Sequence, residues 1–450
     1  MSLYDTIIRG GTLVTETDVV QADLGIADQR IAAIEPQLAG TSRAEIDAAG
    51  LHVFPGLIDA HVHFNEPGRT DWEGFATGSR ALAAGGVTSY CEMPLNAHPP
   101  TIDATSFDLK CAAAATASLV DFGLWGGLVP GNVDRLDELA DRGVVGFKAF
   151  MSNSGIDDFA AADDVTLYQG MQRAAQLDRL VAVHAENDQI TSFLAREAVA
   201  AGRIGVRDYL ASRPGVAELE AIARALVLAE ETGCALHIVH VSTGRGVALV
   251  AAARERGVDV SCETCPHYLV LTEDDMEELG AIAKCAPPLR PQAEQDALWF
   301  HLASGSLPMI ASDHSPAPAE MKTDPNFFNV WGGISGCQST LPLLLTEGYA
   351  RDRLPLTRIA TITAGFVARR FRLPGKGRIE IGNDADLALV DLNGQRALQS
   401  VDLLYRHRHS PYVGRMMRGR IERTLVRGTT VFHAGAIVSP PIGRLLTPQR

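Results

Sequence analysis

The sequence contains no apolar stretch that approaches the ~20 residues of a membrane-spanning helix. Its first five residues carry no charged leader followed by an apolar block, so we expect no secretory signal and a cytoplasmic location. Basic charge is in deficit, because 40 Lys and Arg stand against 54 Asp and Glu, for a net charge of −14. That sign repels phosphate backbones and anionic lipid, which argues against nucleic-acid and membrane partners.

Paired cysteines are also lacking. The seven cysteines are an odd, scattered set, and without a secretory signal they are expected to be free thiols in a reducing compartment. Cys262 and Cys265 form a CxxC motif, but they lie inside the apolar run 258–270. Buried thiols are common packing residues, so we interpret this pair as structural rather than as a redox or zinc site.

The order of local patterns divides the 450 residues into a centre and two ends. A chain of this length exceeds one ordinary core, so we expect a large domain and a smaller one. Both ends have short strand-like segments between Gly and Asp turns, whereas the centre alternates short apolar runs with helical segments. We therefore predict a barrel domain over residues 53–381 and a small β-sandwich domain formed by residues 1–52 together with 382–450.

Eight apolar runs occupy the centre of this α/β chain. They are Val53–Asp59, Val87–Met93, Asp121–Leu128, Val144–Phe150, Leu180–Ala185, Ala235–Val241, Val258–Thr264 and Pro308–Ser312. Parallel strands that are buried on both faces have this continuous apolar pattern, and the helical segments between them are typical of βαβ units. Eight such units favour a closed (β/α)₈ TIM-like barrel over an open doubly wound sheet, although the count alone leaves both open.

Ionisable side chains stand where several of these runs end. A barrel of this type carries its chemistry at the C-terminal edge of its strands. His61 and His63 are two residues apart, so their imidazoles project to the same side of a strand. His184, His240 and Asp313 stand at the ends of other runs. Five nitrogen and oxygen ligands are more than one tetrahedral zinc takes, so we predict a site for two metal ions.

Lys148 is the unusual member of this set, because it lies inside an apolar strand. An ammonium is costly there unless it is paired or functional, and a structural ion pair is one explanation. Beside two cations a free ammonium would be repelled. Reaction with CO₂ instead gives a carbamate, an anion whose two oxygens can bridge two metals. We therefore predict that Lys148 is N6-carboxylated and bridges the metals.

Asp313 is the candidate catalytic residue. A carboxylate at this position can bind a metal and also accept the proton of the attacking water, whose pKa two cations lower. It can then pass the proton to the leaving nitrogen, acting first as a base and then as an acid. Among the other histidines, His314 and His237 are expected to support the structure. His267 is expected either to line the pocket or to stand behind the ligands.

The HVH motif at 61–63, a strand lysine, two strand-end histidines and a final Asp together resemble the amidohydrolase superfamily, particularly its cyclic amidases. The segment 377–387 is similar to that superfamily's return into its small β domain. The resemblance covers nearly the whole chain. It implies two zinc ions, with cobalt, manganese or nickel as alternatives that the same ligands accept, and a carboxylated lysine. The implied ligands are His61, His63, Lys148, His184, His240 and Asp313.

The loops separate three relatives within the cyclic amidases. Dihydroorotases typically carry an Arg, which holds the substrate carboxylate, where this chain has Asn65, and an amide suits a neutral ring better. Dihydropyrimidinases carry a Tyr where this chain has Asn153. The segments 146–155, 284–290, 312–318 and 332–338 resemble those of the allantoinases most closely.

This resemblance implies a homo-oligomer, commonly a tetramer, that hydrolyses the hydantoin-ring amide of allantoin to allantoate in purine breakdown. A hydantoinase or dihydropyrimidinase acting on other neutral rings is one alternative. A non-catalytic assembly protein is another, although such relatives usually lack the ligands that this chain keeps. Roughly half of the candidate substrate contacts would serve instead as turn residues that satisfy their own backbone. The candidates are Asn65, Ser152, Asn153, Ser154, Ala286 and Ser335.

Overall fold

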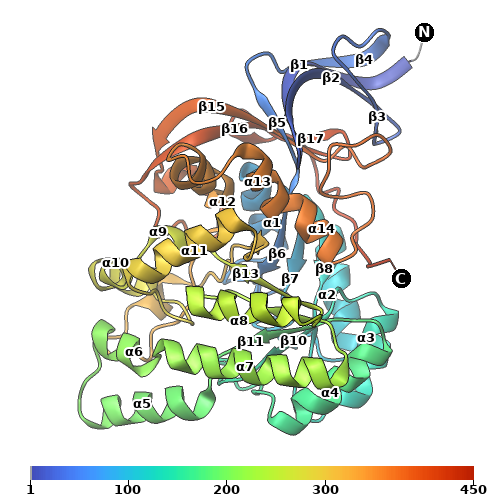
Figure 1. Cartoon of the computed structure of the whole chain (residues 1–450). Helices are drawn as coiled ribbons and strands as arrows, with labels where there is room; N and C mark the ends of the chain where they lie inside the picture. The colour runs from blue at the N-terminus through green and yellow to red at the C-terminus, as the bar shows by residue number, and fades with distance from the viewer. Residues whose placement is uncertain (1–2, 450) are drawn as a thin grey trace.

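Parallel strands form the centre of the chain in the computed structural model, which describes residues 3–449 (Figure 1). They are β6 (Leu57–Val62), β7 (Val87–Glu92), β8 (Asp121–Leu124) continued by β9 (Gly126–Gly127), β10 (Phe147–Phe150), β11 (Val181–His184), β12 (Leu236–Ile238), β13 (Val260–Thr264) and β14 (Met309–Ile310). The segment after β14 returns to β6, where the amide of His63 donates to the carbonyl of His314 at 2.8 Å. The predicted (β/α)₈ barrel is confirmed.

Helices follow the barrel strands along the chain and pack outside them (Figure 1). They are α1 (Phe75–Ala84), α2 (Ala104–Ala117), α3 (Leu136–Asp141), α4 (Asp164–Gln176), α5 (Asp188–Ala200), α6 (Val206–Ser212), α7 (Gly215–Thr232), α8 (Gly244–Glu255), α9 (Pro266–Val270), α10 (Glu273–Leu279), α11 (Gln292–Ser304), α12 (Thr340–Leu343), α13 (Leu356–Ala360) and α14 (Phe366–Arg370). Local chemistry sets their ends. The Thr243 side chain accepts from the amide of Gly246 and caps α8, and α7 ends at the left-handed Gly233. Within residues 3–449, no helix combines the length and apolarity that crossing a bilayer requires.

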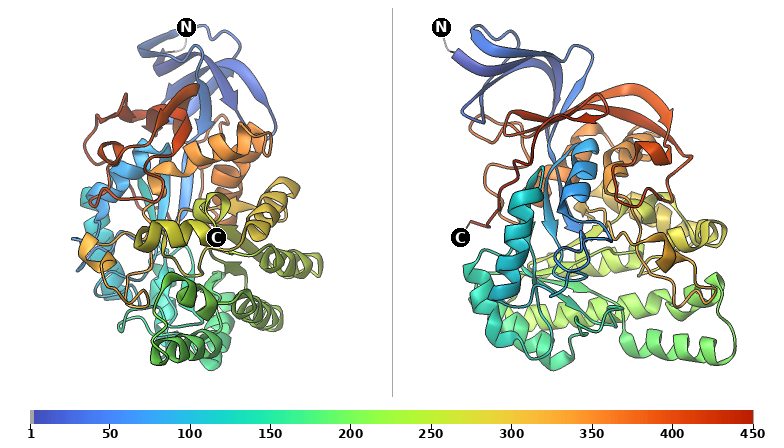
Figure 2. Two further views of the ribbon diagram at one scale, coloured as in Figure 1. Left: turned by 90° about the vertical axis from the view of Figure 1, so that its left-hand side faces the viewer. Right: turned by 180° about the vertical axis from the view of Figure 1, so that it is seen from behind.

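The two ends of the chain meet in one mixed sheet at one end of the barrel (Figure 2). Its strands are β1 (Leu3–Val14), β2 (Val19–Ala27), β3 (Arg30–Glu35), β4 (Thr41–Asp47), β5 (His52–Pro55), β15 (Leu387–Ala397), β16 (Met416–Val426), β17 (Thr429–His433) and β18 (Ala436–Ile437). The antiparallel pair β5–β15 joins the strands of the two termini. Ile8 and Leu24 from one end share an apolar core with Leu387 and Leu425 from the other.

The first expected barrel strand, Val53–Asp59, is divided between the two sheets. Its beginning lies in β5 of the terminal sheet, and its end lies in β6 of the barrel. The division falls at Gly56, where a β-carbon would lie 2.1 Å from the Thr88 hydroxyl oxygen, so only glycine fits without a shift. An uninterrupted apolar run does not reveal this division, because both strands are buried.

A buried cluster of charges joins the barrel to the terminal sheet. The Lys376 ammonium lies 2.6 Å from Asp121 of β8, 2.9 Å from Asp384 and 2.7 Å from Asp386. Arg427, in the turn before β17, also pairs with Asp121. These carboxylates depend on the two cations, because a buried anion without a partner is strongly disfavoured.

Replacing Lys376 with methionine is therefore expected to destabilise the protein by about 3–5 kcal/mol, the usual cost of removing one partner of a buried ion pair. Thermal unfolding monitored by circular dichroism measures the effect. Arg224→Leu is the matched control, because it breaks an ion pair with Asp164 at the surface, which contributes about 0–1 kcal/mol. Equal shifts in the two variants would contradict the structural role of the cluster.

Candidate metal centre

The strand ends bring the predicted ligands together. His61 is the second-last residue of β6 and His184 the last residue of β11, and His240 and Asp313 follow β12 and β14. Together with His63 they line one cavity of about 410 Å³. The parallel strands create this convergence, because their carboxyl ends all meet at one edge of the barrel.

Three of the ligand atoms form one group. The Nε2 atoms of His61 and His63 lie 3.2 and 3.4 Å from Oδ1 of Asp313. All three residues offer ligand atoms within 4.8 Å of one another. Two imidazoles and a carboxylate at this spacing fit a divalent cation with a preference for nitrogen and oxygen ligands.

The other two histidines form a second group. Nδ1 of His184 lies 3.1 Å from Nε2 of His240. The ring of His240 is also 5.4 Å from that of His61, centroid to centroid, so the two groups are neighbours. Two ring nitrogens directed at the same place suit a second cation.

Lys148 lies in β10 and is completely buried. Among residues 3–449 its amine has no hydrogen-bond partner, and it lies 4.5 Å from the centre of the Phe150 ring. Burial lowers the pKa of Lys148 to about 7. Within residues 3–449 the Lys148 amine forms no ion pair, so the structural ion pair considered from the sequence is not found there.

The backbone at two ligands is strained. His240 has a φ of +39° and Asp313 a φ of +47°, in the left-handed region that residues other than glycine rarely adopt. Such strain persists where the surrounding structure imposes it, and it is concentrated at functional sites. Burial opposes ionisation of Asp313, but the positive potential of His61, His63 and His240 outweighs it and holds the pKa of that carboxyl well below its usual range. Asp313 is thus an anion before any cation binds.

Two carboxylates that the sequence patterns did not predict lie behind the histidines. Glu263 of β13 accepts from Nδ1 of His61 at 2.7 Å and contacts Nε2 of His237 at 3.1 Å. Glu186 contacts Nε2 of His184 at 2.9 Å. Such partners fix the tautomer and direction of a metal-binding imidazole. One signal was available, because Glu263 is a charged residue inside the seventh apolar run, as Lys148 is inside the fourth.

The supporting histidines lie behind the cavity wall. His237 and His314 are fully buried, and His314 Nδ1 accepts from the amide of Gly336 at 3.1 Å. His267 is also buried and is absent from the cavity lining, while it lies close enough to Asp313 to share a group of possible ligands with Cys265. Of the two positions expected for His267, the structure places it behind the ligands.

The six candidate substrate contacts divide into two sets. Asn153, Ser154 and Ala286 line the cavity, whereas Asn65, Ser152 and Ser335 are buried and do not. The Ser154 hydroxyl donates to the backbone carbonyls of residues 156 and 159, and the Asn153 side chain accepts from the amide of residue 155. These two side chains therefore satisfy their own loop, as turn residues do.

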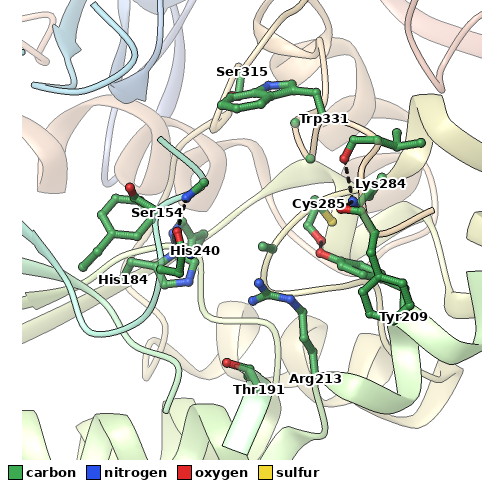
Figure 3. A pocket seen from close by; sticks show the side chains of 18 of the residues that line it. Ser154, His184, Thr191, Tyr209, Arg213, His240, Lys284, Cys285, Ser315 and Trp331 are labelled. Atoms are coloured by element: carbon green, nitrogen blue, oxygen red, sulfur yellow. Dashed lines mark hydrogen bonds between the residues drawn. The ribbon is translucent and has the colours of Figure 1, made fainter. Parts of the chain in front are cut away.

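The outer wall of the cavity is held by two lysines. The segment 328–333 lines the cavity opposite the histidines, and Figure 3 shows Trp331 and Lys284 on that side. The Lys284 ammonium donates to the carbonyls of Phe327 at 2.6 Å, Phe328 at 3.2 Å and Val330 at 2.5 Å. The Lys322 ammonium donates to those of residues 281, 331 and 333. Both lysines thus serve as structural anchors of the wall.

Comparisons with known proteins agree with this geometry. The chain matches the amidohydrolase family over residues 52–431. It is 63% identical over 450 residues to an allantoinase of Rubrobacter xylanophilus, which covers 100% of this chain and 99% of that protein. It is 52% identical over 450 residues to an allantoinase of Deinococcus radiodurans, with both chains covered completely.

Solved structures show the same architecture. The L-hydantoinase (dihydropyrimidinase) of Arthrobacter aurescens superimposes with a TM-score of 0.96 at 35% identity, covering 99% of this chain and 100% of that one. A D-hydantoinase from a Thermus species superimposes with a TM-score of 0.93 at 28% identity, covering 98% and 99%. The chain is therefore a hydrolase that belongs to the amidohydrolase family and, within that family, to the allantoinases.

Proposed function

We propose that this enzyme hydrolyses the hydantoin-ring amide of allantoin to give allantoate, with two divalent cations bound at the strand ends. The observation that supports this most directly is the convergence of five strand-end ligands on one cavity, in a chain that is 63% and 56% identical over its full length to two allantoinases. A hydantoinase acting on other neutral rings is the second candidate, because hydantoinases have the same fold. Turnover of allantoin to allantoate, compared with that of hydantoin, tests the choice.

His61, His63 and Asp313 would hold one cation, and His184 with His240 would hold the other. Lys148 lies fully buried in β10, beside β11, which carries His184. As an N6-carboxylated residue it would provide an anion for both cations. Zinc suits this donor set best, and cobalt, manganese or nickel are alternatives. When bound, the cations supply positive charge that polarises the scissile carbonyl and lowers the pKa of water.

Asp313 transfers the proton between the attacking water and the leaving nitrogen. The Asp313 carboxylate accepts a proton from the attacking water as the new C–O bond forms. It then donates that proton to the ring nitrogen as the C–N bond breaks, so that the nitrogen leaves as a neutral amide. The nearby His61, His63 and His240 lower the pKa of Asp313, so its side chain is a carboxylate. Glu263 and Glu186 keep His61 and His184 in one orientation during the cycle.

The proposal includes a cytoplasmic homotetramer, which is supported by the family resemblance and by the expectation of a reducing compartment. All seven cysteines are free thiols in the structure. Analytical ultracentrifugation of the purified enzyme measures the number of subunits.

Protein purified without chelator is expected to contain about two equivalents of metal, because the ligands exceed what one tetrahedral ion takes. In Lys148→Ala, activity and most of the metal should be lost together, because the anion shared by both positions is gone. A small carboxylic acid such as propionate, added to the variant, should restore part of both by supplying a carboxylate in the space that the side chain leaves. Elemental analysis and allantoin turnover measure the two effects.

The same acid added to the unaltered enzyme is the control and should change neither value. Full activity of Lys148→Ala without added acid would exclude a bridging role for Lys148. A metal content near zero in fully active protein would exclude the metal-dependent mechanism as a whole.

A further inference from the structure

Glu186, two residues after His184, is a fully buried carboxylate on which two groups converge. Its Oε2 atom contacts Nε2 of His184 at 2.9 Å and forms an ion pair with Arg213. The ion pair with the Arg213 guanidinium identifies Glu186 as a carboxylate, which can only accept hydrogen bonds.

This arrangement fixes the tautomer of His184. A carboxylate that accepts from Nε2 requires the proton on that nitrogen, which leaves the lone pair on Nδ1. Nδ1 is the atom that faces His240 at 3.1 Å, in the second ligand group. The ring of His184 is also stacked on Phe150, with centroids 4.5 Å apart, so its plane is held as well.

Arg213 is itself held in place from behind. Arg290 donates to the backbone carbonyl of Arg213 at 2.6 Å and to the Ser242 hydroxyl at 3.0 Å. Ser242 follows His240 by two residues, and Glu218 accepts from its amide and its hydroxyl at 2.7 and 2.8 Å. The connection that begins at His184 thus returns to the strand end that carries His240. Figure 3 shows Arg213 beside the cavity, between the two histidines and Tyr209.

The first ligand group has a different support. His61 is oriented by Glu263, whose other contact is His237, a buried histidine whose pKa is lowered well below its usual value by burial and then by nearby Arg370 and Lys148. The second partner of Glu263 is thus the neutral imidazole of His237, whereas the second partner of Glu186 is the guanidinium of Arg213. The two groups therefore depend on separate carboxylates, and within residues 3–449 Arg213 forms an ion pair with one of them, Glu186.

We propose that Arg213 is a positioning residue, which acts through Glu186 to set the cation affinity of the His184–His240 position and leaves that of the His61–His63–Asp313 position unchanged. This inference rests on the proposed two-metal site. Arg213 holds the Glu186 carboxylate in place, and Glu186 in turn keeps the His184 lone pair directed at the cation. Without Arg213, the carboxylate can turn away, and the imidazole can change tautomer or rotate.

The test is a zinc titration of the metal-free protein against a competing chromophoric chelator. The unaltered enzyme is expected to show two binding steps. In Arg213→Met one step should weaken by about 10–100-fold, the usual effect of losing the partner behind a ligand, while the other step keeps its affinity. Arg213→Lys should recover part of the loss, because an ammonium can still pair with Glu186. Arg207→Met, at the surface of helix α6, which ends immediately before Arg213, is the matched control and should leave both steps unchanged.

A second variant covers the case in which Arg213→Met does not fold. Glu186→Gln keeps the size of the side chain but removes its charge, and it should weaken the same single step. For either variant, two unchanged steps would overturn the proposal. Two equally weakened steps would also overturn it, because they would indicate a general structural role. Absence of zinc binding by the unaltered enzyme would overturn the proposed two-metal function instead.

Discussion

Asp313→Asn is expected to lower kcat for allantoin by at least about 10²–10⁴, the usual contribution of a positioned acid–base group. An amide is nearly isosteric with the carboxylate, so the fold should persist, but it cannot accept the proton of the attacking water. Asp313 is the group placed for this transfer, because Oδ1 lies 3.2 Å from Nε2 of His61 and 3.4 Å from that of His63, at the first ligand group. Steady-state kinetics at saturating allantoin measure the effect.

The control for this variant is Asp164→Asn, the same chemical change at the start of α4, where the carboxylate is exposed and pairs with Arg224. It should leave kcat unchanged. Metal content must be measured for both variants, because Asp313 is also a candidate ligand. A loss of only a few-fold in Asp313→Asn with both metals present would assign the proton transfer to another residue.

Much of this centre could be predicted from local sequence. The HxH pattern is a local feature, and so is the position of His184, His240 and Asp313 at the ends of apolar runs. The topology of the parallel barrel brings these residues together. Lys148 was recognisable because a charged residue inside an apolar strand needs an explanation. These predictions depend only on the order of short segments.

The remaining features depend on tertiary contacts between distant residues. The pairing of Glu263 with His61 spans 202 positions, and that of Arg213 with Glu186 spans 27. No periodicity reports such pairs. The direction of loop side chains is equally hidden, because Asn65 has a left-handed backbone and is buried beside Pro316, although its position in the motif suggested a contact with the substrate.

The largest effect on specificity is expected between neutral and anionic rings. The cavity lining includes two cationic residues, Arg213 and Lys284, and both side chains already bind other groups of the protein. Arg213 pairs with Glu186, and the three protons of the Lys284 ammonium are matched by three backbone carbonyls. Asp188 adds a negative charge to the same wall. A substrate carboxylate would therefore find no uncommitted cationic side chain among the described residues that line the cavity.

Dihydroorotate carries such a carboxylate, and burying it without a cationic partner costs several kcal/mol. Allantoin is neutral, and its ureido arm offers donors and acceptors that suit backbone groups of the 328–333 wall and the loop at Asn153. We therefore expect kcat/KM for allantoin to exceed that for dihydroorotate by at least ~10³, the scale set by leaving a buried polar group unpaired. Parallel assays of allantoin, hydantoin, dihydrouracil and dihydroorotate with one enzyme preparation measure this ratio.

The other two rings in the panel separate the sources of the preference. Hydantoin shares the five-membered ring of allantoin but lacks the ureido arm, so its deficit reports what the arm contributes to binding in the transition state. Dihydrouracil should also be slower than allantoin, because the tyrosine that dihydropyrimidinases carry is replaced here by Asn153, whose side chain is engaged within its own loop. Dihydroorotate turned over as fast as allantoin would show that a cationic side chain of the cavity is available to the substrate carboxylate. A clear preference for dihydrouracil would place the activity with the dihydropyrimidinases, whose fold the chain shares.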